Sequence, residues 1–214
     1  MKTAVRRPVG RPRAFDRDRA LARAMEIFWS KGFEAASLAD LTRAMRINPP
    51  SLYAAFGDKE SLFIEAVQSY HEAVRQSCPY AGEPTARAAV ERLLTELAAL
   101  FTDRGHPRGC LAVMAMVTAG TTSARLQKLL AEERGAARAR LRERIHQGVE
   151  DGDVPADTDV HTLTDFYAAV IMGMSLQARE GASRKALLAM VETAMRAWPQ
   201  SAKRTARRKA AVAA

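Results

Sequence analysis

Cysteine is scarce in this chain of 214 residues, in which Cys78 and Cys110 are the only two. They lie far apart, and neither belongs to a CxxC pair or stands near paired histidines, so the sequence indicates neither a disulfide framework nor a zinc site. The four histidines are scattered, without the spacing of metal ligands or of a nucleophile and its base. We therefore expect no metal, no cofactor and no catalytic residue.

Long hydrophobic runs are also missing. The longest nearly uncharged stretches, around GCLAVMAMVTAG and FYAAVIMGMSLQA, are shorter than the ~20 apolar residues that a membrane span needs. The N-terminal stretch MKTAVRRPVGRPRAF has no apolar signal core. We expect a cytoplasmic protein without a membrane partner, and its hydrophobic content of 48% is sufficient for a real core.

Acidic residues are absent from both ends of the chain. Residues 1–13 contain five basic side chains, and residues 201–214 contain another five. Subtracting these ten positive charges from the formal net charge of +9 leaves −1 for residues 14–200. The basic character therefore belongs to a flexible arm, residues 1–13, and a disordered tail, residues 201–214, which are of the kind that contacts polyanions.

No stretch alternates in the manner of a β-strand, and helical periodicity takes its place. Leu21, Ala24, Met25 and Phe28 recur at helical spacing between residues 16 and 31. The sequence predicts an all-α protein in which breaks rich in glycine, proline and aspartate separate the later helices. These are expected at about residues 84–104, 109–119, 122–150, 158–180 and 183–198.

Signals for helix ends lie close together between residues 37 and 57. Ser37 precedes a short second helix, with Asp40 three residues on as in a capping box. Asn48 is a favourable N-cap for a third helix, and Pro49 and Pro50 fit its first turn, where backbone N–H groups have no intrahelical partner. Two short helices joined by a tight turn have the pattern of a helix-turn-helix, a DNA-binding unit.

A fourth helix is expected after Asp58, its cap, and Lys59 lies in its first turn. A positive charge there is unfavourable for the helix dipole, and a bound phosphate would relieve that conflict. Oxyanions bind well at helix N-termini, and neutral hydrogen-bonding side chains lie near those of the second and third helices. These side chains are Ser37, Asn48, Ser51 and Tyr53.

The stretch RDRALARAMEIFWSKGFEAASLADLTRAMRINPPSLYAAFGDKESLFIEAV, with the residues just before it, resembles the N-terminal DNA-binding domain of the TetR/AcrR family of bacterial transcriptional regulators. The resemblance covers about residues 12–65, and the rest of the chain is similar mainly in architecture. It implies a helix-turn-helix domain over residues 14–60 and a helical ligand-binding and dimerisation domain over residues 61–200. The implied function is that of a homodimeric, ligand-responsive regulator, a repressor that a small-molecule effector releases from double-stranded operator DNA.

The resemblance also assigns roles to residues that match the family pattern. Its phosphate-contacting positions fall on Ser37, Tyr53 and Lys59. Many relatives have lysine, arginine or glutamine at the base-contacting positions, whereas this chain offers mainly contacts with thymine methyl groups and with groove shape. Part of the specificity is therefore expected from Arg11 and Arg13, in the minor groove. The base-contacting positions themselves are Asn48, Pro49, Pro50, Ser51 and Ala54.

For the C-terminal domain, the resemblance implies an effector cavity and a two-fold four-helix dimer interface on the last two helices. Candidate cavity residues are Phe101, Cys110, Met114, Phe166, Met172 and Gln177, although methionines at helical spacing also suit an ordinary core. Candidate interface residues are Ala169, Gly173, Leu187, Leu188, Val191, Met195 and Trp198.

Two other classes of function remain open at this point. An all-helical enzyme acting on an apolar substrate would need a cluster of acid, base or metal-binding residues, against which the scattered histidines argue. A sequence-indifferent nucleic-acid-coating protein would bind unrelated DNA sequences with similar affinity. A redox role for Cys110 also stays open.

Overall fold

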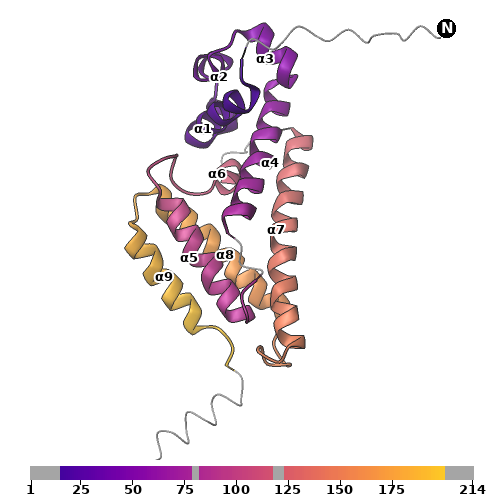
Figure 1. The fold of residues 1–214 in the computed structure, drawn as a ribbon, viewed down its shortest axis with the longest axis vertical. Helices are drawn as coiled ribbons and strands as arrows, with labels where there is room; N and C mark the ends of the chain where they lie inside the picture. Colours follow the sequence, from indigo (N-terminus) through magenta and orange to yellow (C-terminus); the bar gives the residue numbers. More distant parts are fainter. Residues whose placement is uncertain (1–14, 79–81, 118–122, 201–214) are drawn as a thin grey trace, which may run out of the picture.

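The computed structural model describes residues 15–78, 82–117 and 123–200, and these residues form nine α-helices and no β-strand (Figure 1). This confirms the predicted all-α class. The helices at one end of the molecule are α1 (Arg17–Ala35), α2 (Leu38–Met45) and α3 (Pro49–Phe56), from which α4 (Lys59–Ser77) runs toward the remaining helices. These are α5 (Ala86–Thr102), α6 (Leu111–Val117), α7 (Ala124–Glu150), α8 (Val160–Arg179) and α9 (Arg184–Arg196). Within the described ranges, no helix is both long and apolar enough to span a bilayer.

The predicted helix starts are confirmed by the hydrogen bonds of their caps. Ser37 and Asp40 form a reciprocal capping box at the start of α2. The side chain of Asn48 accepts a hydrogen bond from the backbone N–H of Ser51 at 2.8 Å, and two prolines occupy the first turn of α3. Asp58 accepts from the backbone N–H of Ser61 at 2.6 Å. Each cap satisfies backbone donors that would otherwise lack a partner.

The turn between α2 and α3 depends on a strained residue. Arg46 adopts the left-handed conformation, with φ 57° and ψ 42°. This conformation costs a non-glycine residue roughly 1–2 kcal/mol. In return, the N–H groups of Arg46 and Ile47 donate to the carbonyls of Arg43 and Thr42, at 3.3 and 3.1 Å, so the end of α2 is closed by hydrogen bonds.

Two hydrophobic cores lie along the molecule. The first core combines α1 to α4 with α6 and the start of α7, and its centre contains Phe28 and Phe63, whose rings meet edge to face at 4.9 Å. The domain boundary expected at residue 60 does not follow this core, because the buried residues of α4, from Leu62 to Tyr70, belong to it. The helix-turn-helix therefore rests on α4 and α6 as well as on α1.

The second core joins helices that are distant in sequence: α5, the end of α7, α8 and α9. Tyr167 is fully buried there and donates a hydrogen bond to the carbonyl of Ala194 at 3.2 Å. Burial raises the pKa of Tyr167 to about 12. Val74 and Cys110 contact both cores, so they mark the junction between the two halves of the molecule.

Candidate nucleic-acid interface

Helix α3 presents its outer face to solvent. Leu52 and Phe56 are buried in the first core, whereas Pro49, Pro50 and Ala54 are exposed. Tyr53 is 47% exposed, a high value for a large aromatic side chain, and its hydroxyl has no hydrogen-bond partner among the described residues. An exposed helix with free polar groups, anchored from behind by two apolar side chains, has the form needed to enter a major groove.

Arg17 fixes the orientation of α3 relative to α1 and α4. Arg17, at the start of α1, makes a two-pronged ion pair with Glu65 of α4, in which Nη2 donates to Oε2 at 2.8 Å. The same Nη2 donates to the carbonyl of Ala55 in α3 at 3.2 Å, and the guanidinium lies 4.4 Å from the centre of the Phe56 ring. Bidentate arginine–carboxylate pairs are geometrically specific, so this pair ties three helices together. Sequence analysis missed it because the partners are 48 residues apart.

The start of α2 has a dense set of polar contacts. Asp40 accepts hydrogen bonds from the hydroxyl and the backbone N–H of Ser37, at 2.8 and 3.2 Å, and pairs with Lys31 of α1 at 2.9 Å. The Lys31 ammonium, with help from these Ser37 donors, lowers the pKa of Asp40 to about 2. Both donors of Ser37 are therefore already bonded to Asp40, and a phosphate at this helix end would have to share or displace a bond.

The Lys59 ammonium has partners within the protein that the sequence did not indicate. Its ammonium donates to the carbonyl of Glu34 at 3.3 Å and lies 4.6 Å from the centre of the Phe33 ring, both at the end of α1. Partial burial lowers the pKa of Lys59. The conflict expected between this charge and the dipole of α4 is thus relieved within the protein, because the charge lies at the carbonyl end of another helix.

A hollow of about 500 Å³ between the start of α1 and the end of α2 was not expected from the sequence. Arg19, Arg43 and Arg46 line it, all exposed, and their guanidinium groups make no hydrogen bond or ion pair with the described residues. A fourth lining arginine, Arg23, pairs with Glu26 at 3.2 Å. The hollow begins at Phe15, where the basic arm ends; Arg11 and Arg13 of that arm lie outside the described residues.

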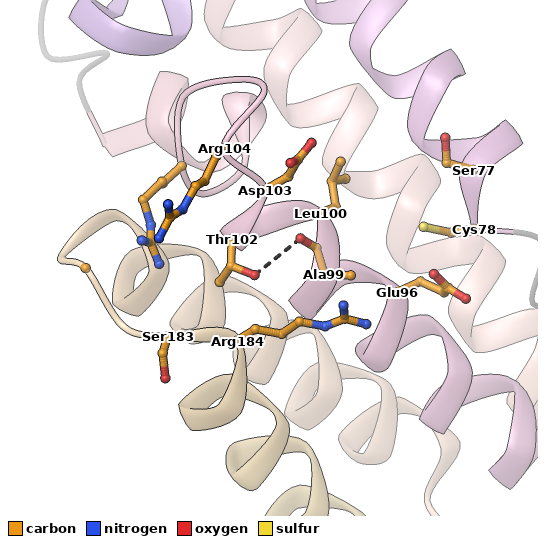
Figure 2. A pocket seen from close by; sticks show the side chains of 12 residues that line it. Ser77, Cys78, Glu96, Ala99, Leu100, Thr102, Asp103, Arg104, Ser183 and Arg184 are labelled. Carbon is orange, nitrogen blue, oxygen red and sulfur yellow. Dashed lines mark hydrogen bonds between the residues drawn. The ribbon is translucent and has the colours of Figure 1, made fainter.

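The residues predicted to line an effector cavity are only partly brought together, since Cys110, Met114 and Met172 all meet at the first core. A cavity of about 910 Å³ lies elsewhere, between the ends of α4 and α5 and the turn from α8 to α9, and none of the six lines it (Figure 2). Phe166 and Gln177 are exposed in the single chain and line neither described cavity. Phe101 and Met114 are buried in the second and first core, Cys110 lies between the cores, and Met172 packs against the first.

The predicted dimer residues fall into two groups. Leu187, Val191, Met195 and Trp198 are no more than 4% exposed within a single chain, as part of the second core. Because these side chains are already covered inside one chain, a partner could bury little more of them.

The other predicted dimer residues keep positions that a partner could reach. Ala169 is exposed, and Gly173 and Leu188 are partly exposed. On the same side of α8, Phe166 and Leu176 are 40% and 38% exposed, unusual values for large apolar side chains. A set of small and apolar residues at spacings of three and four forms one continuous strip along the helix.

Two short helices with this turn, an exposed second helix and arginines at its flank define a helix-turn-helix DNA-binding protein. Residues 20–66 match the family described as "Bacterial regulatory proteins, tetR family", and residues 86–198 match "Tetracyclin repressor-like, C-terminal domain". The chain belongs to the TetR family of bacterial transcriptional regulators, which are DNA-binding proteins and not enzymes.

Named relatives and solved structures agree with this assignment. The chain is 34% identical over 202 residues to the HTH-type transcriptional repressor ComR of Escherichia coli (strain K12), covering 93% of this chain and 96% of ComR. It is 31% identical over 185 residues to the repressor BdcR of the same organism, covering 84% and 87%. A cysteine-substituted variant of the TetR-family regulator CifR, complexed with 26-base-pair operator DNA, is 51% identical, with a TM-score of 0.84 over 88% of this chain and all of that one.

Proposed function

We propose that this regulator is a homodimeric repressor that binds operator DNA through α2 and α3 and releases it when a small molecule binds the C-terminal half. Support comes from its similarity to two named repressors and to a regulator whose structure contains operator DNA. Because the proposed partner is chromosomal DNA, we place the protein in the cytoplasm.

The observation that carries this proposal is the exposed face of α3, fixed in orientation by the Arg17–Glu65 pair. We propose that Tyr53 donates its free hydroxyl to a DNA phosphate and that Asn48 and Ser51 reach base edges. Pro49, Pro50 and Ala54 supply apolar contact in the groove, and neutral groups of this kind read thymine methyls and groove shape.

Contacts outside α3 complete the proposed interface. Ser37 and Lys59 approach phosphates on either side of the groove, through contacts shared with Asp40 and Glu34. Arg11 and Arg13 of the arm enter the adjacent minor groove. Arg19, Arg43 and Arg46 lie where the arm joins α1, so we propose that they neutralise phosphates flanking the half-site.

The proposed domains follow from these roles: an arm over residues 1–13, a DNA-binding domain over 14–60, an effector and dimer domain over 61–200 and a tail over 201–214. An operator with two half-sites requires two copies related by two-fold symmetry. We propose that the strip of α8 containing Phe166, Ala169, Gly173 and Leu176, with Leu188 beside it, meets its symmetry mate.

The test begins with selection of bound sequences from random DNA, followed by fluorescence anisotropy with the selected operator. Tyr53→Phe should weaken operator binding by roughly 1–3 kcal/mol, equally for all operator variants, because phosphates carry no direct sequence information. An unrelated duplex of the same length is the control. Similar affinity for that duplex would favour a coating protein instead, and an unchanged affinity of the variant would remove Tyr53 from the interface.

A further inference from the structure

The cavity at the junction of the two halves has polar walls. We call this cavity the polar groove. Its walls are the ends of α4 and α5, the loop 103–108 and the turn between α8 and α9 (Figure 2). Arg104 extends into it from the loop, and Arg184 reaches across α5 from the start of α9 (Figure 2). Neither guanidinium group makes a hydrogen bond or ion pair with the described residues. Two free guanidinium groups on opposite walls suit a small anion.

A third arginine gives the groove an excess of positive charge. Arg108 donates to the carbonyls of Ala178, at 2.9 Å, and Ala182, so its donors are bonded but its charge meets no carboxylate there. Against the three arginines the groove contains two carboxylates, Glu96 and Asp103. Ala99 and Leu100 of α5 add an apolar part to the wall. The lining therefore combines a net positive charge with an apolar floor.

The loop that forms one wall of the groove also contacts the DNA-binding half. His106, two residues after Arg104, stacks on Trp29 of α1 with ring centres 4.5 Å apart and an angle of 17° between the planes. Trp29 also meets Tyr70 of α4 edge to face at 5.0 Å. The Trp29 Nε1 has no hydrogen-bond partner among the described residues, and the nearest charged group to the His106 Nε2 is Asp103 Oδ2, at 3.7 Å. Ring contact is therefore the main link between this loop and Trp29. A movement of the loop would therefore be transmitted to α1 through these rings.

The opposite wall reaches α1 as well. Arg179, at the end of α8 just before the turn that lines the groove, donates to the carbonyl of Ser30 at 2.6 Å. Ser30 is next to Trp29 and to Lys31, which pairs with Asp40 at the start of α2. Arg108 links the two walls through the carbonyls of Ala178 and Ala182. Both walls of the groove thus contact the C-terminal part of α1, which is bonded to the start of α2 through Lys31 and Asp40.

We propose that the polar groove is the effector site and that it takes a small carboxylate with an apolar body. The carboxylate bridges Arg104 and Arg184, and the apolar body lies over Ala99 and Leu100. Occupancy draws the two walls together and moves the His106 and Arg179 contacts against α1, which alters the operator-binding geometry of α2. This inference rests on the proposed function, and it places the effector outside the cavity expected from the sequence.

Such an effector can change operator affinity only if it binds the DNA-free and the operator-bound forms of the protein with different affinities. A carboxylate that binds the DNA-free form more tightly lowers operator affinity, and operator DNA lowers carboxylate affinity by the same factor. The bridging geometry supplies that difference, because both arginines reach one carboxylate only when the walls stand at the correct separation.

Binding is tested without DNA by titration calorimetry on the full-length protein. The probes are benzoate, octanoate and 4-phenylbutyrate at millimolar concentration, with their amides and inorganic phosphate as controls. At least one carboxylate should bind roughly tenfold more tightly than its amide and than phosphate. The double variant Arg104→Ala/Arg184→Ala should lose that affinity, whereas Arg142→Ala, an exposed and unpaired arginine on α7, should retain it.

Coupling is tested with the selected operator. The carboxylate that binds should lower operator affinity in the natural protein, and His106→Leu should retain carboxylate binding while losing this effect. Arg179→Ala removes the other contact with α1, and it tests the coupling in place of His106→Leu if that variant does not fold. The proposal is overturned if no probe binds, if an amide or phosphate binds equally well, or if the double arginine variant or the coupling variants behave like the natural protein. Failure to select any DNA would instead refute the proposed function and leave the calorimetric result standing.

Discussion

The two cores differ in the sequence separation of the residues that form them. Most of the first core comes from the continuous stretch between Ala20 and Tyr70, whereas the second joins α5 to α9 across about a hundred residues. Caps and turns act over three or four residues, so they shape the first region strongly. The second region depends on which apolar faces meet, which local signals do not specify. The DNA-binding surface was accordingly easier to recognise than the effector and dimer surfaces.

The largest expected effect comes from Trp198, because this large side chain is buried in the second core. The side chain is 2% exposed and its ring lies 5.5 Å from that of Tyr167. Trp198→Ala should lower the free energy of unfolding by about 3–5 kcal/mol, since it leaves a large cavity. Urea denaturation at one fixed protomer concentration measures this, because the stability of a dimer depends on concentration.

Leu176→Ala, on the exposed strip of α8, is the matched control for Trp198→Ala. It should change the unfolding free energy of the protomer by less than about 1 kcal/mol and weaken self-association, as judged by sedimentation. If Trp198→Ala weakened self-association while leaving the isolated protomer intact, the division between core and interface drawn above would be wrong.

A smaller effect is expected from Arg17, which links α1, α3 and α4 in the first region. Arg17→Met keeps the apolar stem but removes the charged hydrogen bonds, so operator affinity should fall roughly tenfold with little loss of helix content. Anisotropy and circular dichroism measure the two quantities. Arg87→Met, which breaks an exposed pair on α5, should leave operator affinity unchanged. Full operator affinity in the Arg17 variant would show that α3 keeps its orientation without the pair.

Deleting the basic arm should make DNA affinity less sensitive to salt concentration. Removing residues 1–13 should make the slope of log K against log salt concentration shallower by roughly 1–3 units per dimer. It should also reduce preference for A·T pairs beside the half-site. Deleting residues 201–214, which follow the second core, should change the slope much less. A larger effect of the second deletion would reverse the roles proposed for the two ends.

The smallest expected effect concerns the pH dependence of stability at the start of α2. The pKa of Asp40 is about 2 in the folded protein and 3.8 without its partners, so the carboxylate stabilises the fold fully above pH 3.8. That stabilisation is lost as the pH falls toward about 2. The difference between the natural protein and Asp40→Asn in urea midpoints should shrink over this interval. A difference that stayed constant down to the lower pH would exclude the linkage.

Much of the fold could be predicted from the sequence where one residue decides a local structure. Ser37, Asn48 and Asp58 each form the cap expected of them, and the prolines start α3 rather than break it. The later helices also lie within a few residues of their expected bounds, because apolar spacing follows the helical period.

The sequence could not show what each apolar face packs against. The stripe of α9 that includes Leu187, Val191 and Met195 has the period of a buried face, and that period is the same for a core and for a dimer interface. The polar groove was missed because Arg104 and Arg184 are 80 residues apart and have no common motif. The Arg17–Glu65 pair shows the same limit within the first region, where a charged pair joins separate helices.

The composition of the first core has a consequence for synthesis. That core extends from Ala20 to Tyr70 and is completed by Leu111 to Leu130, in α6 and the start of α7. Ribosomes add about 5–20 residues per second, so the roughly 60 residues between Tyr70 and Leu130 take about 3–12 s to appear. During that interval the apolar side chains that α6 and α7 later cover stay exposed on the nascent chain, so the DNA-binding half is complete only after Leu130 has been added.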